Sequence, residues 1–145
     1  MKYDDNLFYT CSLIEYIGRI TKNSRKTLIT YLKPDIGRIY RHASVFHCEP
    51  IEKVADDFIE RNHIPTGDFD NLSDTKYDVP SYWDIGKVFE RLIVDTSDDR
   101  SREEAVSEVF SSELAEKILN YNSDLYYQPR EYLAECYREG NVIDA

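Results

Sequence analysis

Apolar residues recur at helical spacing along almost the whole chain. Leu7, Cys11, Ile14 and Ile17 form the first such stripe, and they predict a helix from residue 5 to about residue 21. Further stripes predict helices that begin near residues 25, 34, 50, 81, 98, 112 and 129. Only five Gly and five Pro leave room for few tight turns, and 145 residues suit one domain. The pattern therefore predicts an all-α, single-domain bundle of seven or eight short helices.

The second and third of these helices meet at a proline. Asn23-Ser24 offers an N-cap for a helix that would end near Lys33, and Pro34 suits the first turn of the next one. Two short helices joined by a very short turn match the arrangement of a helix-turn-helix, in which one helix enters the major groove of DNA. The same pairing is also common in ordinary helical bundles.

Residues 63–81 break the helical pattern. The segment contains Pro65, Gly67, Pro80 and several Asp residues, and no period is sustained along it. We expect a long irregular connection here, between an N-terminal helical part (residues 1–62) and a C-terminal helical part (residues 82–145). Connections of this length inside a compact domain are often functional.

Charge is distributed unevenly along the chain, whose net charge is −10. From Ile51 onward there are 10 Lys or Arg against 23 Asp or Glu, whereas residues 19–42 hold seven cations and a single acid. The seven cations are Arg19, Lys22, Arg25, Lys26, Lys33, Arg38 and Arg41. A basic patch on an acidic body indicates a charged partner. If the partner is nucleic acid, these seven residues would contact its phosphates, although the acidic remainder would repel a polyanion.

Tyrosine is the second unusual feature of the composition, with twelve residues, several of them beside acids. Tyr and Trp side chains are enriched in the hot spots of protein interfaces, the residues that contribute most of the binding energy. Surrounding acids steer a basic partner towards the interface. The ordinary alternative is that most of these rings fill the core. The residues that we expect to contact a partner are Tyr82, Trp83, Asp124, Tyr126 and Tyr127.

The sequence contains no pattern typical of a metal site, a cofactor site or a catalytic site. The soft candidate ligands are His42, His47, Cys48 and His63. They lack the paired spacing of a zinc site, and the Asp-rich stretch at 68–74 lacks the Gly and closing Glu of a calcium-binding loop. No phosphate-binding loop and no nucleophile elbow is present. We therefore expect no metal, cofactor or catalytic residue, with a small enzyme using His63 and the nearby Asp residues as the least favoured alternative.

Three widely spaced cysteines indicate reduced thiols, and no apolar run approaches the length of a membrane helix. We expect a cytoplasmic protein that does not enter the membrane.

Ser123-Asp124-Leu125-Tyr126-Tyr127-Gln128-Pro129-Arg130-Glu131 resembles a Ser-Asp-Leu-Ile-Tyr-Tyr-Pro-Lys-Glu stretch of the colicin nuclease immunity proteins. Those proteins are small, acidic, all-helical inhibitors whose paired tyrosines and acids bind a basic nuclease domain. The resemblance covers about nine residues. It implies that Asp124, Tyr126 and Tyr127 contact the partner.

The N-terminal part resembles short uncharacterised helical proteins found in toxin-antitoxin-type loci. The shared pattern is Phe-x-x-x-x-x-Ile-Glu from Phe8 to Glu15, followed later by Ile-Glu-x-Val-x-x-Asp-Phe-Ile from Ile51 to Ile59. This resemblance implies a genetic neighbourhood and no mechanism.

These observations favour a non-enzymatic interaction module of antitoxin or immunity type, which binds a basic toxin or nuclease-like protein through an acidic, Tyr-rich surface. The alternative is a nucleic-acid-binding regulator that uses the basic 19–42 segment. The basic segment could equally serve self-association, and the oligomeric state stays open.

Overall fold

The computed structural model describes residues 3–140 and residue 142. These residues form eight α-helices and one 3₁₀ turn and contain no strand, which confirms the predicted all-α bundle. The elements are α1 (Asp5–Thr21), α2 (Arg25–Arg41), α3 (Ala43–Phe46), α4 (Ile51–Arg61), α5 (Tyr82–Thr96), α6 (Arg102–Phe110), α7 (Glu113–Ile118), η1 (Leu125–Tyr127) and α8 (Arg130–Glu139).

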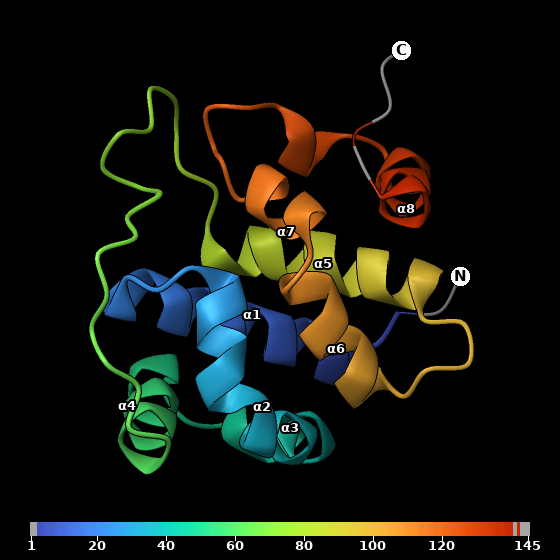
Figure 1. Ribbon diagram of the computed structural model, residues 1–145. Helices are drawn as coiled ribbons and strands as arrows, with labels where there is room; N and C mark the ends of the chain where they lie inside the picture. The colour runs from blue at the N-terminus through green and yellow to red at the C-terminus, as the bar shows by residue number, and fades with distance from the viewer. Residues whose placement is uncertain (1–2, 141, 143–145) are drawn as a thin grey trace.

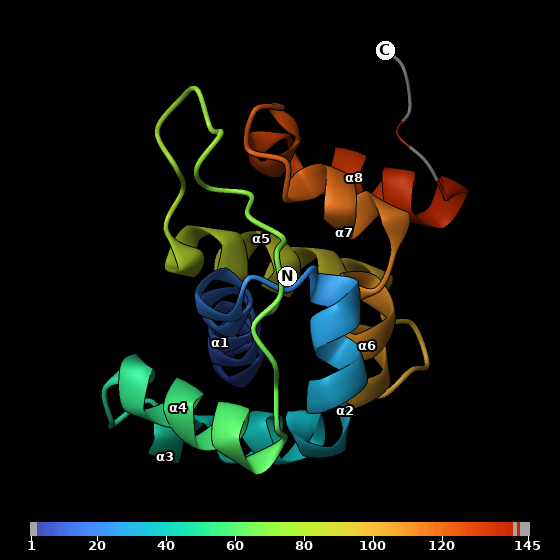
Figure 2. The same cartoon turned by 60° about the vertical axis from the view of Figure 1, so that its left-hand side comes forward.

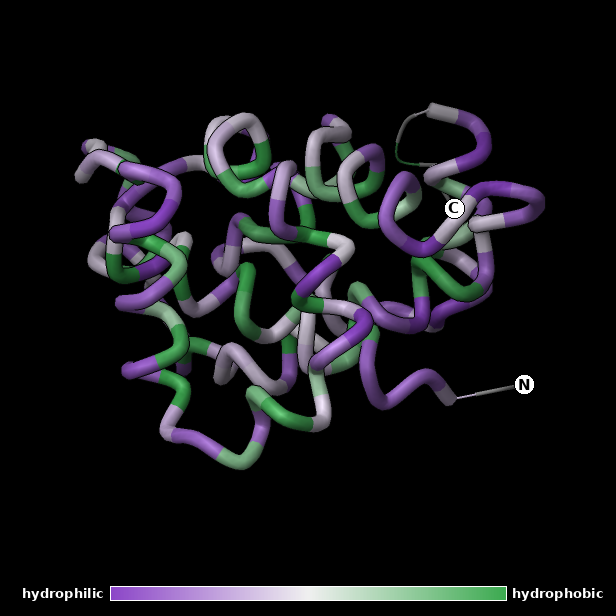
Figure 3. Tube along the Cα trace, turned by 90° about the horizontal axis from the view of Figure 1, so that it is seen from below, coloured by the Kyte–Doolittle hydropathy of each residue, from purple (hydrophilic) through white to green (hydrophobic). Residues whose placement is uncertain are grey.

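Helix α1 lies at the centre of the molecule. It packs against α5 on one side, against α2 on another, and against α3 and α4 below, as Figures 1 and 2 show. Helix α1 is buried on almost every side, with Leu7, Leu13 and Ile17 fully withdrawn from solvent. Short hydrophobic and hydrophilic stretches follow one another along the chain trace (Figure 3). The core is therefore organised around one helix that the outer helices enclose.

Side-chain caps explain most of the helix starts. The Asp4 carboxylate accepts from the Leu7 amide at 3.0 Å, and the Ser112 hydroxyl accepts from the Ala115 amide at 3.1 Å. Ser81 and Asp84 form a capping box at the start of α5. Because such caps satisfy amides that have no partner inside the helix, they define where the capped helices begin. The predicted starts near residues 5, 50, 81, 112 and 129 are confirmed.

The predicted break at Pro34 is wrong, because α2 runs unbroken from Arg25 to Arg41 with the proline inside it. Leu28, Leu32 and Ile36 are fully buried and form one apolar stripe that continues past the proline. Burial of this stripe against α1 and α6 outweighs the local cost of a helix-interior proline, which is about 3 kcal/mol. The two-helix geometry of a helix-turn-helix is therefore absent from this segment.

Two smaller predictions also need correction. Helix α6 does not begin at Asp98, because Asp98 adopts a left-handed backbone with φ 51°. The chain turns there, and Ser101 caps the helix by accepting from the Glu104 amide at 3.1 Å. A 3₁₀ turn at Leu125–Tyr127, which the apolar spacing does not indicate, precedes α8.

The long connection between α4 and α5 is confirmed, because residues 63–81 form neither helix nor strand. It rises along one side of the molecule from α4, loops above the start of α5 and returns to it (Figure 1). Among the described residues, no helix combines the length and the apolar character that crossing a membrane requires.

Candidate functional site

The first half of the 63–81 connection is tied to the turn between α1 and α2. The Gly67 amide donates to the Thr21 carbonyl at 2.8 Å, and the Phe69 amide donates to the Lys22 carbonyl at 2.9 Å. A Cβ on Gly67 would lie 2.5 Å from the Lys22 carbonyl oxygen, so only glycine permits this close approach. Backbone hydrogen bonds thus hold the connection in place without secondary structure.

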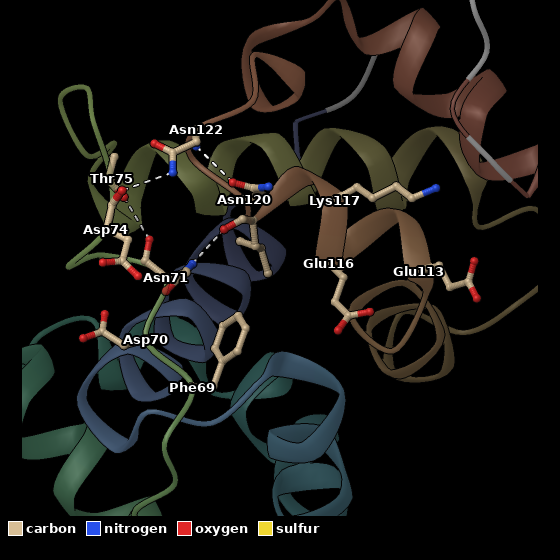
Figure 4. A pocket seen from close by; sticks show the side chains of 11 residues that line it. Phe69, Asp70, Asn71, Asp74, Thr75, Glu113, Glu116, Lys117, Asn120 and Asn122 are labelled. Carbon is tan, nitrogen blue, oxygen red and sulfur yellow. Dashed lines mark hydrogen bonds between the residues drawn. The ribbon is translucent and has the colours of Figure 1, made fainter.

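The second half is tied to the segment that follows α7. The Asn71 side-chain amide donates to the Leu119 carbonyl at 2.9 Å. Asn122 makes two bonds, since its Nδ2 donates to the Asp74 carbonyl at 3.1 Å and its Oδ1 accepts from the Lys76 amide at 2.8 Å. Segments about 46 residues apart in the sequence therefore lie side by side and form one surface (Figure 4).

A buried ionic cluster anchors this surface to the core. Glu15 is fully buried, and its two carboxylate oxygens accept from Arg25 Nε and Arg19 Nε, each at 2.8 Å. Tyr121 donates its hydroxyl to the same carboxylate, and Arg19 also donates to the Pro80 carbonyl at 2.7 Å. The cluster therefore joins α1 and α2 to the end of the 63–81 connection and to the segment after α7.

The groups around Glu15 counteract the effect of burial on the pKa of its carboxyl. Burial raises the pKa of the Glu15 carboxyl, but Arg25, Arg19 and the Tyr121 hydroxyl together outweigh it, so the pKa lies below its ordinary value. Burial and the Glu15 charge raise the pKa of Tyr121, so the phenol keeps its proton and donates it to the carboxylate. Glu15 is therefore ionised in the folded protein, and its carboxylate is the shared acceptor of this cluster.

A cavity of about 450 Å³ opens between the 63–81 connection and α7 (Figure 4). We call it the acidic cavity. Its apolar lining comes from Phe69 and Leu119. Among the described residues, its charged lining consists of Asp70, Asp74, Glu113 and Glu116, with Lys117 as the one cation. A lining that combines apolar side chains with mainly acidic ones is complementary to a long basic side chain, whose stem is apolar and whose head is charged.

Asp70 is partly used by its own turn. Its carboxylate accepts from the Ser73 hydroxyl and from the backbone amides of Leu72 and Ser73 at 2.9 and 3.1 Å. These hydrogen bonds hold the pKa of Asp70 at about 2. Asp70 is therefore ionised at neutral pH and contributes negative charge to the rim.

A second hollow, of about 500 Å³, lies next to the acidic cavity, and Asn122 lines both. We call it the tyrosine hollow, because Tyr77, Tyr121, Tyr126 and Tyr127 line it together with Asp124. Tyr77 is 70% exposed and Tyr127 is 66% exposed, whereas Tyr126 packs edge-on against Tyr121 at 5.8 Å. The 3₁₀ turn thus directs consecutive tyrosines to different environments.

The structure separates the five expected contact residues into two groups. Asp124, Tyr126 and Tyr127 line the tyrosine hollow. Tyr82 packs on Tyr16 at 4.9 Å, and Trp83 stacks on His47 at 5.4 Å, both at the start of α5. Neither Tyr82 nor Trp83 lines the tyrosine hollow or the acidic cavity.

The seven basic residues also divide. Arg19 and Arg25 face inward and pair with Glu15, so they are not available to a surface ligand. The remaining five are exposed, namely Lys22, Lys26, Lys33, Arg38 and Arg41. The charge count in the sequence does not reveal this division, since buried and exposed arginines look alike in it.

The residues considered for metal or catalytic chemistry do not converge. Within the described ranges, no group of three or more His, Cys, Asp or Glu residues could hold a metal ion. His63 is exposed and has a left-handed backbone conformation. It is not one of the described residues that line the acidic cavity or the tyrosine hollow. Cys11 and Cys136 are buried as free thiols, and Cys48 is an exposed free thiol.

Several residues of the surface were not singled out from the sequence. Phe69 and Asn71 belong to an aperiodic segment, and Asn122 follows a helix end, so no spacing rule identifies them. Exposed Tyr77 is next to Asp78 in the sequence, and a nearby acid is also the signal that indicates Tyr126, which lies two residues after Asp124.

No protein-family model matches this sequence, and no curated protein or solved structure matches it either.

Proposed function

We propose that this protein binds a basic protein, of the toxin or nuclease kind, as a non-enzymatic inhibitor of antitoxin or immunity type. The binding surface consists of the tyrosine hollow and the adjoining acidic cavity. The observation that carries the proposal is the position of Tyr77 and Tyr127, which are largely exposed around a hollow that also contains Asp124.

Exposed aromatic side chains suit this role. A tyrosine offers a large, rigid contact area and fixes only two side-chain torsions on binding, so the entropy cost is small. Tyr77 comes from the 63–81 connection and Tyr127 from η1, and Asn122, three residues before η1, is hydrogen-bonded to the connection at Asp74 and Lys76. The aromatic contacts are therefore held in place before a partner arrives, which reduces the cost of ordering them.

The charge around the hollow suits a basic partner. Asp70, Asp74, Glu113 and Glu116 line the adjoining cavity against one Lys, and Asp124 lines the hollow itself. Acidic groups at the rim of an interface accelerate association with a basic protein and disfavour acidic partners. The resemblance of residues 123–131 to immunity proteins falls on this same surface.

An affinity capture with matched variants tests the proposal. Tagged wild-type protein and the double variant Tyr77→Ala/Tyr127→Ala are incubated with native lysate, with and without added nuclease. The control is Tyr31→Ala, which removes an exposed tyrosine that lies outside the surface. We expect a basic protein, retained after nuclease treatment, on the wild type and the control and not on the double variant. Equal recovery on all three would contradict the assignment of the surface.

A second candidate function rests on the exposed face of α2. Lys26, Lys33, Arg38 and Arg41 are exposed on this helix, and at 100° per residue they share an arc of about 140°. Such a face could bind nucleic acid through phosphate contacts alone. In the same capture, nucleic acid that is lost with Lys33→Ala/Arg38→Ala/Arg41→Ala would favour this function. Its affinity would also fall steeply with added salt, because counterions are released from the nucleic acid on binding.

A further inference from the structure

A cavity of about 550 Å³ lies between the start of α1 and α3, and it shares no lining residue with the surface described above. Four rings line it, those of Tyr3, Phe8, Tyr9 and His47. This volume is within the range of small-molecule sites, which are concave, largely aromatic or apolar, and carry a few polar groups. We call it the aromatic cavity.

The rings of this cavity belong to one connected cluster. The ring centroids of Tyr3 and Phe8 are 6.1 Å apart, and those of Tyr9 and His47 are 4.9 Å apart. Trp83 connects the two pairs, because its ring centroid lies 5.6 Å from that of Phe8 and 5.4 Å from that of His47. The cavity wall is therefore a connected aromatic surface, in which Tyr9 is buried, Phe8 is half-buried, and Tyr3 and His47 are exposed.

Two polar features distinguish this wall from an ordinary apolar cleft. The exposed carboxylate of Asp5 lies at the cavity, and the nearly fully buried Tyr9 has a hydroxyl without a hydrogen-bond partner in the part of the chain that the structure describes. Such unpaired groups are rare in native proteins, but this hydroxyl has almost no accessible surface, so a ligand in the cavity would meet the Asp5 carboxylate and not the Tyr9 hydroxyl.

The electrostatic environment of the cavity is negative. Burial and the nearby charges of Asp5 and Glu90 raise the pKa of Tyr3 and outweigh the opposing charge of Arg91. Burial and the charge of Glu49 raise the pKa of Tyr9 to about 12. Both phenols are neutral at physiological pH, so the carboxylates supply the net charge. The faces of aromatic rings are themselves negative and attract cations.

We propose that the aromatic cavity binds an alkylated ammonium group, with Tyr3 and Phe8 supplying ring faces and Asp5 the counter-charge. A quaternary ammonium has no N–H group and therefore donates no hydrogen bond to an acceptor. The negative faces of the aromatic rings attract its charge instead. Its methyl groups also bury apolar area against the rings. The same chemistry occurs in a free cation such as choline and in a trimethyl-lysine side chain of another protein.

The fluorescence of Trp83 provides the measurement, because it is the only tryptophan in the chain and it contacts Phe8, Tyr9 and His47. The full-length protein is titrated with choline and, separately, with 3,3-dimethyl-1-butanol, which has the same shape without the charge. We expect a saturable fluorescence change with choline and at least tenfold weaker binding of the neutral alcohol. No saturable response to choline or to the methylated peptide below, or equal binding of choline and the alcohol, would overturn the proposal.

Variants keep the test specific to the cavity. Tyr3→Ala and Asp5→Asn, at two exposed positions, should each weaken choline binding at least fivefold and leave the helical circular dichroism unchanged. Tyr31→Ala, an exposed tyrosine on α2, is the matched control and should bind as the wild type does. If Tyr3→Ala and Asp5→Asn both bind choline normally, the site lies elsewhere and the proposal fails.

A peptide pair then identifies the source of the cation. One peptide carries trimethyl-lysine and the other an unmodified lysine at the same position. Tighter binding of the methylated peptide than of choline would assign the cavity to a modified protein, whereas the reverse order would assign it to a free cation. Equal binding of both peptides would show that alkylation is not recognised and would contradict the proposal.

Discussion

The Nε atom of Arg25 lies 2.8 Å from a carboxylate oxygen of Glu15, and both side chains are withdrawn from solvent. The two residues belong to different helices, and Arg19 and Tyr121 hold the other oxygen of the same carboxylate. Because Arg19 also binds the Pro80 carbonyl, the position of the 63–81 connection depends on this cluster. The proposed binding surface is therefore coupled to a charge pair in the core.

Loss of Arg25 should destabilise the protein strongly. Arg25→Met keeps an apolar stem but removes one of the two cations that neutralise buried Glu15. Breaking one side of a buried ion pair costs about 3–5 kcal/mol, and we expect about 3 kcal/mol because Arg19 remains. Urea unfolding followed by circular dichroism measures the change. Lys26→Met, at the exposed next position, is the control and should stay within about 0.5 kcal/mol of the wild type. A similar small effect for Arg25→Met would show that the pair contributes little.

Stability should depend on pH through Glu15. Its pKa in the folded protein is below the ordinary value of about 4.3, so the unfolded chain binds a proton more readily. The contribution of Glu15 is therefore complete above about pH 4.3 and is lost as the pH falls below that value.

The variant Glu15→Gln tests this dependence. The free energy of unfolding, measured in urea at several pH values from 7 to 3, should fall less steeply below about pH 4.3 in the variant than in the wild type. Glu90, whose pKa is raised by burial, acts in the opposite direction, so the two proteins are compared at each pH. Parallel curves would contradict the assignment of this dependence to Glu15.

Replacing Pro34 with Ala should stabilise the protein. The proline lies inside α2 and its ring lacks the amide proton that would bond to the preceding turn, a defect of about 3 kcal/mol in a helix interior. Pro34→Ala removes that defect and adds about 0.4–1 kcal/mol of freedom to the unfolded chain. We expect a net stabilisation of about 1 kcal/mol or more by urea unfolding. Lys33→Ala should change stability by less than about 0.5 kcal/mol. A destabilised Pro34→Ala would mean that the ring has a role in packing.

The two adjacent tyrosines of η1 should separate binding from folding. Tyr127 is 66% exposed, so Tyr127→Ala should leave the free energy of unfolding within about 0.5 kcal/mol of the wild type. The same variant should weaken partner binding by about 2 kcal/mol or more if Tyr127 is a hot spot of the interface. Tyr126→Ala should lower stability measurably, because it removes the edge-on contact with Tyr121. Unchanged affinity of a folded Tyr127→Ala protein for the captured partner would exclude this role.

Local rules in the sequence were sufficient for the fold class and for most helix starts. A stripe such as Leu7, Cys11 and Ile14 is apolar because one face of a helix must be buried, and a residue such as Ser81 caps a helix through its own next turn. Both effects act within a few residues, so the local sequence is enough to predict them. The irregular 63–81 connection was predicted for the same reason, by the lack of any period.

Only the tertiary structure decided three further points. Helix α2 continues through Pro34 because buried Leu32 and Ile36 on either side of it pack against other helices. Arg25 is a core residue because Glu15, ten positions earlier, lies opposite it. The tyrosine hollow exists because Asn122 joins two segments about 46 residues apart. Each outcome depends on contacts between distant residues, and the energy of such contacts has no signature in the local sequence.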